Sequence, residues 1–217
     1  MKNNTRVSNA IIRRLPRYTR YFRYLGALKA RNITRISSKE LSEQMMVTAS
    51  QIRQDLNTFG GFGQQGYGYS VDHLYAEINK ILGLDREYKT VVVGVGHLGQ
   101  AITNHILNYK FGFSIVGLFD VNPTIVGLAI NGVKVQNSSE LEDYVRNNNI
   151  DIGIICCGKD NAQEVADTLV RGGVEGIWNF APIDLDIPER IAVENVHLSE
   201  SLHTLSFLIS SKEKENR

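Results

Sequence analysis

Apolar positions recur at helical spacing between residues 15 and 59 and predict three helices. The longest begins near Pro16, which suits a first helical turn, and two short helices follow over SSKELSEQMMV and TASQIRQDLNTFG. The apolar positions of the long helix are Tyr18, Phe22, Leu25 and Leu28, and those of the second helix are Leu41 and Met45. A long helix followed by two short ones joined by a tight turn is typical of a helix-turn-helix.

The third predicted helix has two faces of opposite character. Thr48 or Ser50 would cap it, and Gly60 and Gly61 would end it. Its apolar face holds Ile52, Leu56 and Phe59, and its polar face holds Ser50, Gln51, Arg53, Gln54 and Asn57. Arginine donates to guanine, and glutamine or asparagine pairs with adenine, so these side chains are of the types that read DNA. We therefore expect this helix to be a recognition helix.

A glycine-rich stretch, GGFGQQGYGYSV, follows the recognition helix and predicts a β-hairpin, or wing. A wing in that position would bring Gln64, Gln65 and the backbone amides of its glycines to the phosphates or the minor groove. Beyond it, a helix is predicted over residues 72–84, and we expect it to pack back on the winged-helix domain. Its apolar positions are Leu74, Ile78, Ile81 and Leu82.

Strand-like and helix-like segments alternate from residue 86 to about residue 195. Runs such as TVVVGV and IDIGIICCG are almost wholly apolar, as strands buried on both faces of a parallel sheet are. The predicted fold class is therefore α/β: a helix-rich winged-helix domain, a doubly wound Rossmann domain with a parallel sheet, and a C-terminal helix. We place the boundaries at residues 1–84, 85–197 and 198–217.

The turn after the first of these strands has the spacing of a dinucleotide-binding loop. Gly94, Gly96 and Gly99 precede a predicted helix, and Asp120 follows 21 residues after Gly99 at the end of the next strand. The first glycine permits a tight turn, the second lets a pyrophosphate approach the backbone, and the third lets the helix pack closely on the sheet. Asp120 would accept from a ribose 2′-hydroxyl and repel a 2′-phosphate, which favours NAD(H) over NADP(H). The alternatives are a glycine turn kept for packing and a site for another adenine nucleotide such as coenzyme A.

Charge is distributed unevenly along the chain. Residues 1–70 have a net charge of +9 and residues 71–217 a net charge of −8, although the whole chain has a net charge of only +1. Such a split predicts a module that binds a polyanion, here double-stranded DNA, joined to an acidic domain. A solvated basic helix face and a helical dimerisation domain are the alternatives.

Composition argues against export and membrane insertion. Among the 217 residues, no apolar run approaches the roughly 20 residues that span a bilayer, and the N-terminus lacks the apolar core of a signal peptide, so we expect a cytoplasmic protein. Cys156 and Cys157 are adjacent in an apolar run and form no recognisable metal motif. We interpret them as small core residues rather than as a redox pair.

The sequence leaves no segment for the substrate domain of a dehydrogenase. After the last predicted strand, IAVENVHL, only one helix follows, and the five histidines form no catalytic constellation. We therefore predict that the cofactor is bound without turnover; the alternative is a small NAD-dependent oxidoreductase whose basic domain mediates association. The final helix either packs on its own sheet or is exchanged with a second subunit. Its apolar positions are Leu198, Leu202, Leu205 and Leu208 or Ile209.

Taken together, these motifs resemble those of the Rex family of redox-sensing transcriptional repressors over nearly the whole chain. The stretches that carry the resemblance are IIRRLPRYTRYF, RISSKELSEQMMVTASQIRQDLNTFGGFGQQGYGY, GVGHLGQAI, LFDVNPTIVG, AQEVADTLVRGGVEGIWNFAP and VHLSESLHTLSFLI. The resemblance implies a homodimer with swapped C-terminal helices that binds a palindromic operator. It also implies that NAD⁺ and NADH bind the Rossmann domain and that NADH releases the protein from DNA.

The resemblance also implies roles for particular residues. The implied cofactor-binding residues are Gly94, Val95, Gly96, His97, Leu98, Gly99, Asp120, Cys157, Gly158, Asn179, Phe180, Ala181 and Pro182. The implied DNA-binding residues are Arg13, Arg14, Arg17, Ser50, Gln51, Arg53, Gln54, Asn57, Gln64, Gln65 and Tyr67. Two positions that take part in the redox switch of relatives depart from the family pattern, because His105 replaces a tyrosine and His197 replaces an aspartate.

Overall fold

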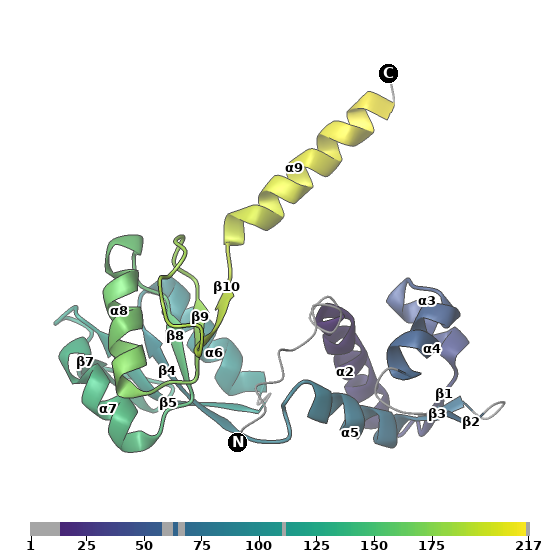
Figure 1. Cartoon of the computed structure of the whole chain (residues 1–217), viewed down its shortest axis with the longest axis horizontal. Helices are drawn as coiled ribbons and strands as arrows, with labels where there is room; N and C mark the ends of the chain where they lie inside the picture. Colours follow the sequence, from purple (N-terminus) through teal and green to yellow (C-terminus); the bar gives the residue numbers. More distant parts are fainter. Residues whose placement is uncertain (1–13, 58–62, 65–67, 110–111, 216–217) are drawn as a thin grey trace. The chain divides into compact units, whose positions relative to one another are not determined.

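A computed structural model of the chain describes residues 14–57, 63–64, 68–109 and 112–215. The chain divides into two compact units, Met1–Arg86 and Glu87–Arg217 (Figure 1). Each unit has its own hydrophobic core.

The first unit is built around α2 (Leu15–Ala30), which has Pro16 in its first turn as the sequence predicts. Its buried residues are Tyr18, Tyr21, Leu25 and Leu28. Phe22, which the helical spacing predicted to be among the buried residues, is only half-buried. It stacks on Tyr75, with ring centroids 4.5 Å apart. Tyr21 takes the buried position because α2 is covered on more than one side.

Two short capped helices follow. α3 (Ser38–Met45) begins with a capping box, in which the Glu40 amide donates to Ser37 Oγ and the Ser37 amide donates to Glu40 Oε2. α4 (Ala49–Asn57) is capped by Thr48, whose Oγ1 accepts from the Gln51 amide at 3.1 Å. Of the two predicted caps for this helix, Thr48 is therefore the one used. Met46 makes the tight turn between the helices with φ +56°.

The wing forms as a hairpin of β2 (Gly63–Gln64) and β3 (Gly68–Ser70), which pair antiparallel. A third strand that the sequence does not predict, β1 (Arg35–Ile36), pairs with the other edge of β3. It is only two residues long, too short to show an alternating pattern. α5 (Val71–Ile81) follows directly, is capped by Ser70 and packs against α2, as predicted.

The second unit contains a sheet of seven strands among the described residues, in the order β10-β9-β8-β4-β5-β7-β6. The strands are β4 (Tyr88–Val93), β5 (Phe113–Asp120), β6 (Ala129–Ile130), β7 (Val133–Asn137), β8 (Ile152–Ile155), β9 (Gly176–Asn179) and β10 (Ala192–Asn195). Only the β6–β7 pair is antiparallel. Without β6, this is the Rossmann order 3-2-1-4-5-6, so the predicted fold class is confirmed.

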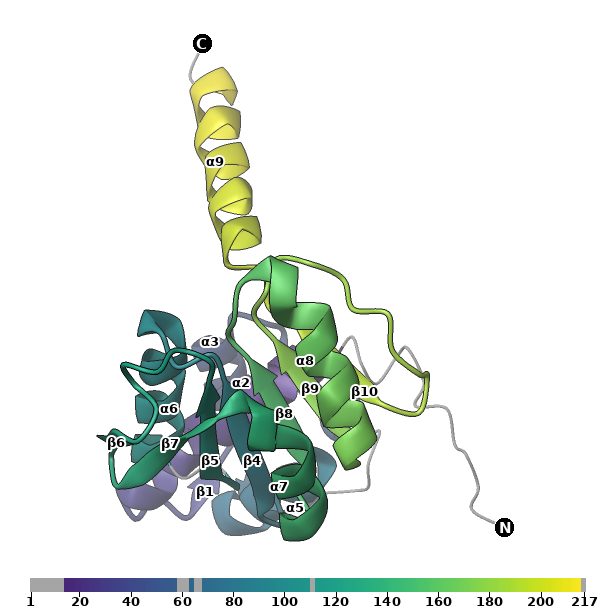
Figure 2. The same cartoon turned by 90° about the vertical axis from the view of Figure 1, so that its left-hand side faces the viewer.

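Helices cover both faces of this sheet (Figure 2). α6 (His97–Tyr109) lies on one face, and α7 (Leu141–Asn148), preceded by the 3₁₀ turn η1 (Ser138–Glu140), and α8 (Lys159–Gly172) lie on the other. Each face has its own apolar cluster. Residues 180–191 connect β9 to β10 without a helix.

The last helix, α9 (Leu198–Glu215), extends away from the sheet (Figures 1 and 2). Six large apolar side chains on it are between 51% and 70% exposed: Leu198, Leu202, Leu205, Phe207, Leu208 and Ile209. Of the two alternatives that the sequence left open, packing on the chain's own sheet is therefore not the one observed.

Candidate nucleotide site and nucleic-acid interface

The glycine turn between β4 and α6 has the geometry that each glycine predicts. Gly94 has φ +91°, and a Cβ there would lie 2.6 Å from the Cys157 amide nitrogen. A Cβ on Gly99 would overlap the carbonyl oxygen of Gly94, so α6 can lie this close to the turn only with glycine at that position. Around Gly96, by contrast, a Cβ would meet nothing within 4 Å. The turn therefore leaves open space beside Gly96, at the N-terminus of α6, where backbone amides favour a phosphate.

Asp120 stands at the end of β5 and is held firmly. Its Oδ2 accepts from the Val95 amide at 2.7 Å, and its Oδ1 accepts from the Asn122 amide at 2.8 Å. A carboxylate has lone pairs for about four hydrogen bonds, so it can still accept from a ribose hydroxyl. Asp120 thus orders the glycine turn and presents negative charge beside it.

A cavity of about 450 Å³ opens at the carboxyl ends of β4, β5 and β8. This is the crevice at the topological switch point, where doubly wound sheets bind their ligands. Of the predicted cofactor residues, Gly94, Gly96, Asp120, Cys157 and Gly158 line it. The lining residues from η1, α7 and α8 were not predicted from the sequence, because their spacing forms no motif. They include Ser138, Leu141, Asn161, Glu164, Val165 and Thr168.

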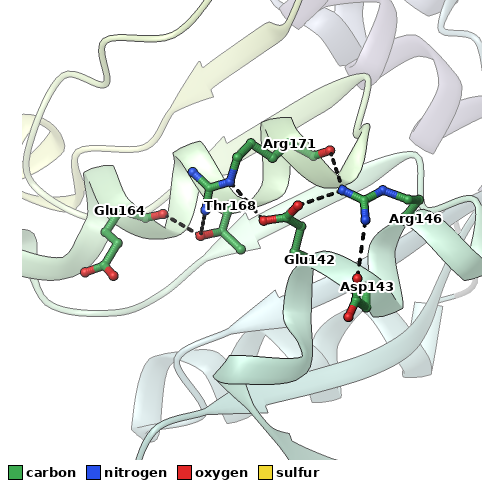
Figure 3. A network of polar contacts seen from close by, with 6 residues as sticks. All are labelled: Glu142, Asp143, Arg146, Glu164, Thr168 and Arg171. Atoms are coloured by element: carbon green, nitrogen blue, oxygen red, sulfur yellow. Dashed lines mark hydrogen bonds and ion pairs between the residues drawn. The ribbon is translucent and has the colours of Figure 1, made fainter.

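An ion-pair network fixes α7 against α8, the two helices that form one wall of this cavity (Figure 3). Glu142 accepts from Arg171 at 2.9 Å and from Arg146 at 2.6 Å, and these two hydrogen bonds hold the pKa of Glu142 below its usual value. Arg171 also donates to Thr168 Oγ1 at 3.0 Å. The side chains lie on the surface, so each pair contributes little to stability, but together they hold the wall in register.

The remaining predicted cofactor residues lie beside the cavity rather than in its lining. Asn179, fully buried, and Ala181, almost fully buried, stand at the end of β9, with Phe180 half-buried against Trp178 and Pro182 exposed. Within the turn, the Val95 side chain is buried in the core, and His97 is exposed at the start of α6. Leu98, the other predicted residue there, is half-buried.

The two switch histidines lie on different elements. His105 is exposed on α6, where it lines an apolar cavity of about 520 Å³ together with Trp178 and Glu194. His197 is half-buried immediately before α9. Their roles in a redox switch stay predictions.

The two cysteines are free thiols on opposite faces of the sheet. Cys156 packs with the cluster on the α6 face, and Cys157 with the cluster on the α7–α8 face. Burial raises the pKa of the Cys156 thiol to about 12 and also raises the pKa of Cys157. Both thiols are therefore partly buried side chains that pack against the core and also line the nucleotide cavity. Among the described residues, no group of three or more His, Cys, Asp and Glu side chains is placed to hold a metal ion.

We therefore expect iodoacetamide to alkylate both thiols slowly in the native protein at pH 7. At Cys156 the rate should be more than about tenfold below that of glutathione, because only the thiolate reacts and its fraction falls about tenfold for each unit by which the pKa rises. The raised pKa of Cys157 should slow its reaction as well. Mass spectrometry of timed samples measures the rate, with urea-denatured protein as the control that reacts fully. Rapid alkylation of the native protein would show that the thiols are accessible and ionised, and a Cys156–Cys157 disulfide would show that the pair is redox-active.

In the first unit, the outward face of α4 carries exposed Ser50, Arg53, Gln54 and Asn57. Arg53 donates to Ser50 Oγ at 3.2 Å and to Ser38 Oγ at 3.4 Å, so its guanidinium is held near the first turns of both α3 and α4. This arrangement presents the polar face that a recognition helix needs. Arg13, Gln65 and Tyr67 lie outside the described residues, as does the side chain of Gln64.

The other predicted DNA-binding residues turn inward to a carboxylate. Asp55 is fully buried on the inner side of α4, and Arg17 donates to both its oxygens at 2.7 and 2.9 Å. Gln51 donates to Asp55 Oδ1 at 2.9 Å, and Arg14 lies 3.9 Å from the same oxygen. These three side chains therefore help to hold the fold, and their contact with DNA stays a prediction.

Two tyrosines of α2 complete this cluster, which sequence reasoning missed. Tyr21 donates its hydroxyl to Asp55 Oδ2 at 2.9 Å, and Tyr18 donates to the Asp55 carbonyl at 3.0 Å. Burial by itself would raise the pKa of Asp55, but the hydrogen bonds from Arg17, Tyr21 and Gln51 outweigh it and lower the pKa. The available signal in the sequence was Asp55 itself, an isolated acid within a basic segment, four residues after Gln51 on the same helix.

A winged-helix unit with a polar recognition helix, followed by a Rossmann unit with a nucleotide cavity, defines a class of proteins: DNA-binding regulators with a nucleotide-binding domain. Two family profiles match the chain, "Putative DNA-binding protein N-terminus" over residues 6–57 and "CoA binding domain" over residues 85–183. The redox-sensing transcriptional repressor Rex of Thermoanaerobacter pseudethanolicus is 56% identical over 213 residues, which cover 98% of this chain and 94% of that protein. The chain belongs to the Rex family of redox-sensing transcriptional repressors, which are regulators rather than enzymes.

Two solved structures of this family are similar over almost their full length. A crystal structure of RSP in complex with beta-NAD+ and operator DNA has a TM-score of 0.88 and 55% identity, and the match covers 98% of this chain and 97% of that one. A crystal structure of RSP in complex with beta-NADH has a TM-score of 0.86 and 52% identity, with 98% of each chain covered. Within the described part of this chain, no helix has the length and apolar character needed to cross a membrane.

Proposed function

We propose that this protein is a cytoplasmic redox-sensing repressor that binds operator DNA as a homodimer and is released when NADH binds. The observation that carries the proposal is the presence, in one chain, of an exposed recognition helix and a cavity formed by the glycine turn and Asp120. A relative with 55% identity was crystallised with both NAD⁺ and operator DNA, which supports the same pair of ligands here.

The charges of the cavity support NAD(H) over the other adenine nucleotides. NADP(H) carries a phosphate on the ribose 2′-oxygen and coenzyme A carries one on the neighbouring 3′-oxygen. Asp120 and Glu164 both line the cavity, and each would repel such a phosphate. The ribose of NAD(H) carries hydroxyls at these positions, and a hydroxyl can donate to Asp120.

The six exposed apolar side chains of α9 support a homodimer in which this helix packs on the second subunit. Full burial of one large apolar side chain is favourable by about 1.5–3 kcal/mol of free energy, so burial of several such side chains favours association. A two-fold dimer would place two recognition helices on the two halves of a palindromic operator.

Operator release tests the proposed function. A palindromic operator is first selected with the full-length protein from a random duplex library, and its binding is then followed by fluorescence anisotropy. NADH is expected to weaken operator binding, whereas NAD⁺, NADPH and coenzyme A at equal concentration leave it nearly unchanged. If NADH does not change the operator affinity and the protein turns over an alcohol or hydroxy acid, an oxidoreductase is favoured instead.

Replacing Arg53 with alanine is expected to weaken operator binding by about 1–3 kcal/mol, roughly 5- to 150-fold, because one bidentate contact to guanine is lost. The fold should be unaffected, since Arg53 is exposed and its hydrogen bonds to Ser50 and Ser38 are long and lie on the surface. Anisotropy measures the affinity, and Lys80→Ala is the matched control, since Lys80 is an exposed cation of the same unit paired with Glu77. Equal operator affinities for the two variants would show that α4 is not the recognition helix.

A further inference from the structure

Asn179 is fully buried at the end of β9 and binds several neighbouring groups at once. Its Nδ2 donates to Asn195 Oδ1 and to the Ile183 carbonyl, both at 2.9 Å, and to the Ala181 carbonyl at 3.3 Å. Its Oδ1 accepts from the Ala181 amide at 2.9 Å. Because both polar atoms of this side chain are already bonded, Asn179 is suited to fixing its neighbours rather than to contacting a ligand.

One set of these neighbours belongs to the nucleotide site. Asp120 marks the adenosine end of the dinucleotide at β5, and the glycine turn after β4 marks the pyrophosphate. The nicotinamide half must then extend away from β5 along the carboxyl ends of the strands, over β8 and β9. Residues 180–183, which Asn179 holds through two carbonyls and one amide, follow directly from β9.

The other set of neighbours leads to α9. β10 pairs parallel with β9, and Asn195 is in register with Asn179. The Val196 amide donates to the Asn179 carbonyl at 2.8 Å, so the backbone and the side chain of Asn179 both anchor the residues that end β10. α9 begins at Leu198, two residues further on.

We propose that the Asn179–Asn195 hydrogen bond couples the nicotinamide end of the site to the base of α9, with Asn179 as a positioning residue. The inference rests on the proposed function, because it describes how the bound nucleotide reaches the dimerising helix. A shift of residues 180–183 against the nicotinamide moves the buried amide, and the amide moves Asn195 and the start of α9. The exposed helix then changes its position on the second subunit.

The test uses the full-length dimer and two substitutions of the exposed partner, Asn195→Ala and Asn195→Asp. Aspartate keeps an oxygen that accepts from Asn179 Nδ2, whereas alanine does not. Glu189→Ala, an exposed residue on the connection that leads into the same strand, is the control. For each protein, operator affinity is measured with and without saturating NADH, and the ratio is the coupling factor; NADH affinity is measured without DNA.

In Asn195→Ala, the coupling factor is expected to fall by about tenfold or more, while the two separate affinities stay within about twofold of the wild type. Asn195→Asp and Glu189→Ala should keep the wild-type factor. A wild-type coupling factor in Asn195→Ala would overturn the inference, and so would an equal loss in Asn195→Asp. If NADH does not affect operator binding in the wild-type protein, the proposed function itself fails, and this result is visible before any variant is compared.

Discussion

Replacing Asp55 with alanine is expected to destabilise the winged-helix unit by about 3 kcal/mol, because removal of one partner leaves a largely buried cation uncompensated. Arg17 would lose both of its hydrogen bonds to the carboxylate, and the Tyr21 hydroxyl would lose its acceptor. The recognition helix would also lose the side-chain hydrogen bonds that tie it to α2, although the bond from Tyr18 to the backbone carbonyl of residue 55 would remain, so operator binding should fall in parallel with stability.

Urea denaturation measures this effect separately in the two units. Trp178, the only tryptophan, lies in the second unit, so its fluorescence follows that unit, while far-UV circular dichroism follows both. We expect Asp55→Ala to shift a circular-dichroism transition to lower urea and to leave the Trp178 transition in place. Asp72→Ala is the control, because its ion pair with Lys29 is exposed and is worth at most about 1 kcal/mol. Equal losses in the two variants would show that the buried cluster does not stabilise the unit.

The same carboxylate makes the winged-helix unit sensitive to acid. The pKa of Asp55 is lower in the folded protein than in the unfolded chain. Its contribution is therefore fully present above the unfolded pKa of about 3.9 and is lost as the pH falls through the lower, folded pKa. This loss should be absent from Asp55→Asn when the two proteins are unfolded side by side between pH 5 and pH 2.

Replacing Gly96 with alanine is expected to weaken NADH binding by about a hundredfold or more, because a methyl group there would displace a charged phosphate from the backbone amides, at a cost of about 3 kcal/mol. The fold should tolerate the change. Gly96 is not among the glycines with positive φ, and its Cβ would meet no atom within 4 Å. Isothermal titration gives the NADH affinity, and thermal unfolding gives the stability.

Gly176→Ala is the matched control, since it adds the same methyl group at the opposite end of β9, where the nearest atoms lie at an ordinary contact distance of 3.6 Å. It should leave NADH binding unchanged. If Gly96→Ala binds NADH as tightly as the control, the open space beside Gly96 does not hold the pyrophosphate, and the glycine turn serves packing alone.

Local signals were sufficient for much of the fold. The glycine spacing from Gly94 to Gly99 and the caps at Ser37 and Thr48 depend on neighbouring residues, so a sequence displays them directly. The third strand of the Rossmann order, β7, was not predicted, because VKVQN is short and partly polar and lies next to the two-residue edge strand β6. Its identity depends on pairing with β5, which no local pattern records.

The features of the candidate sites that could not be predicted depend on contacts between residues far apart in the sequence. The sequence predicts DNA contact for Arg17, but its guanidinium meets an acid 38 residues away on another helix. The cavity lining from α7 and α8 likewise depends on how these helices pack on the sheet. Asn179 matched the family pattern as a cofactor residue, yet its side-chain partners emerged only with the register of β9 and β10.

Redox sensing by one chain requires that NADH and operator DNA weaken each other's binding by the same factor. The most direct measurement is a titration of NADH into the dimer alone and into its complex with the selected palindromic operator. A coupling of about 3 kcal/mol would lower NADH affinity by over a hundredfold in the complex, and NADH would lower operator affinity equally. Equal NADH affinities with and without operator would contradict redox sensing by this protein.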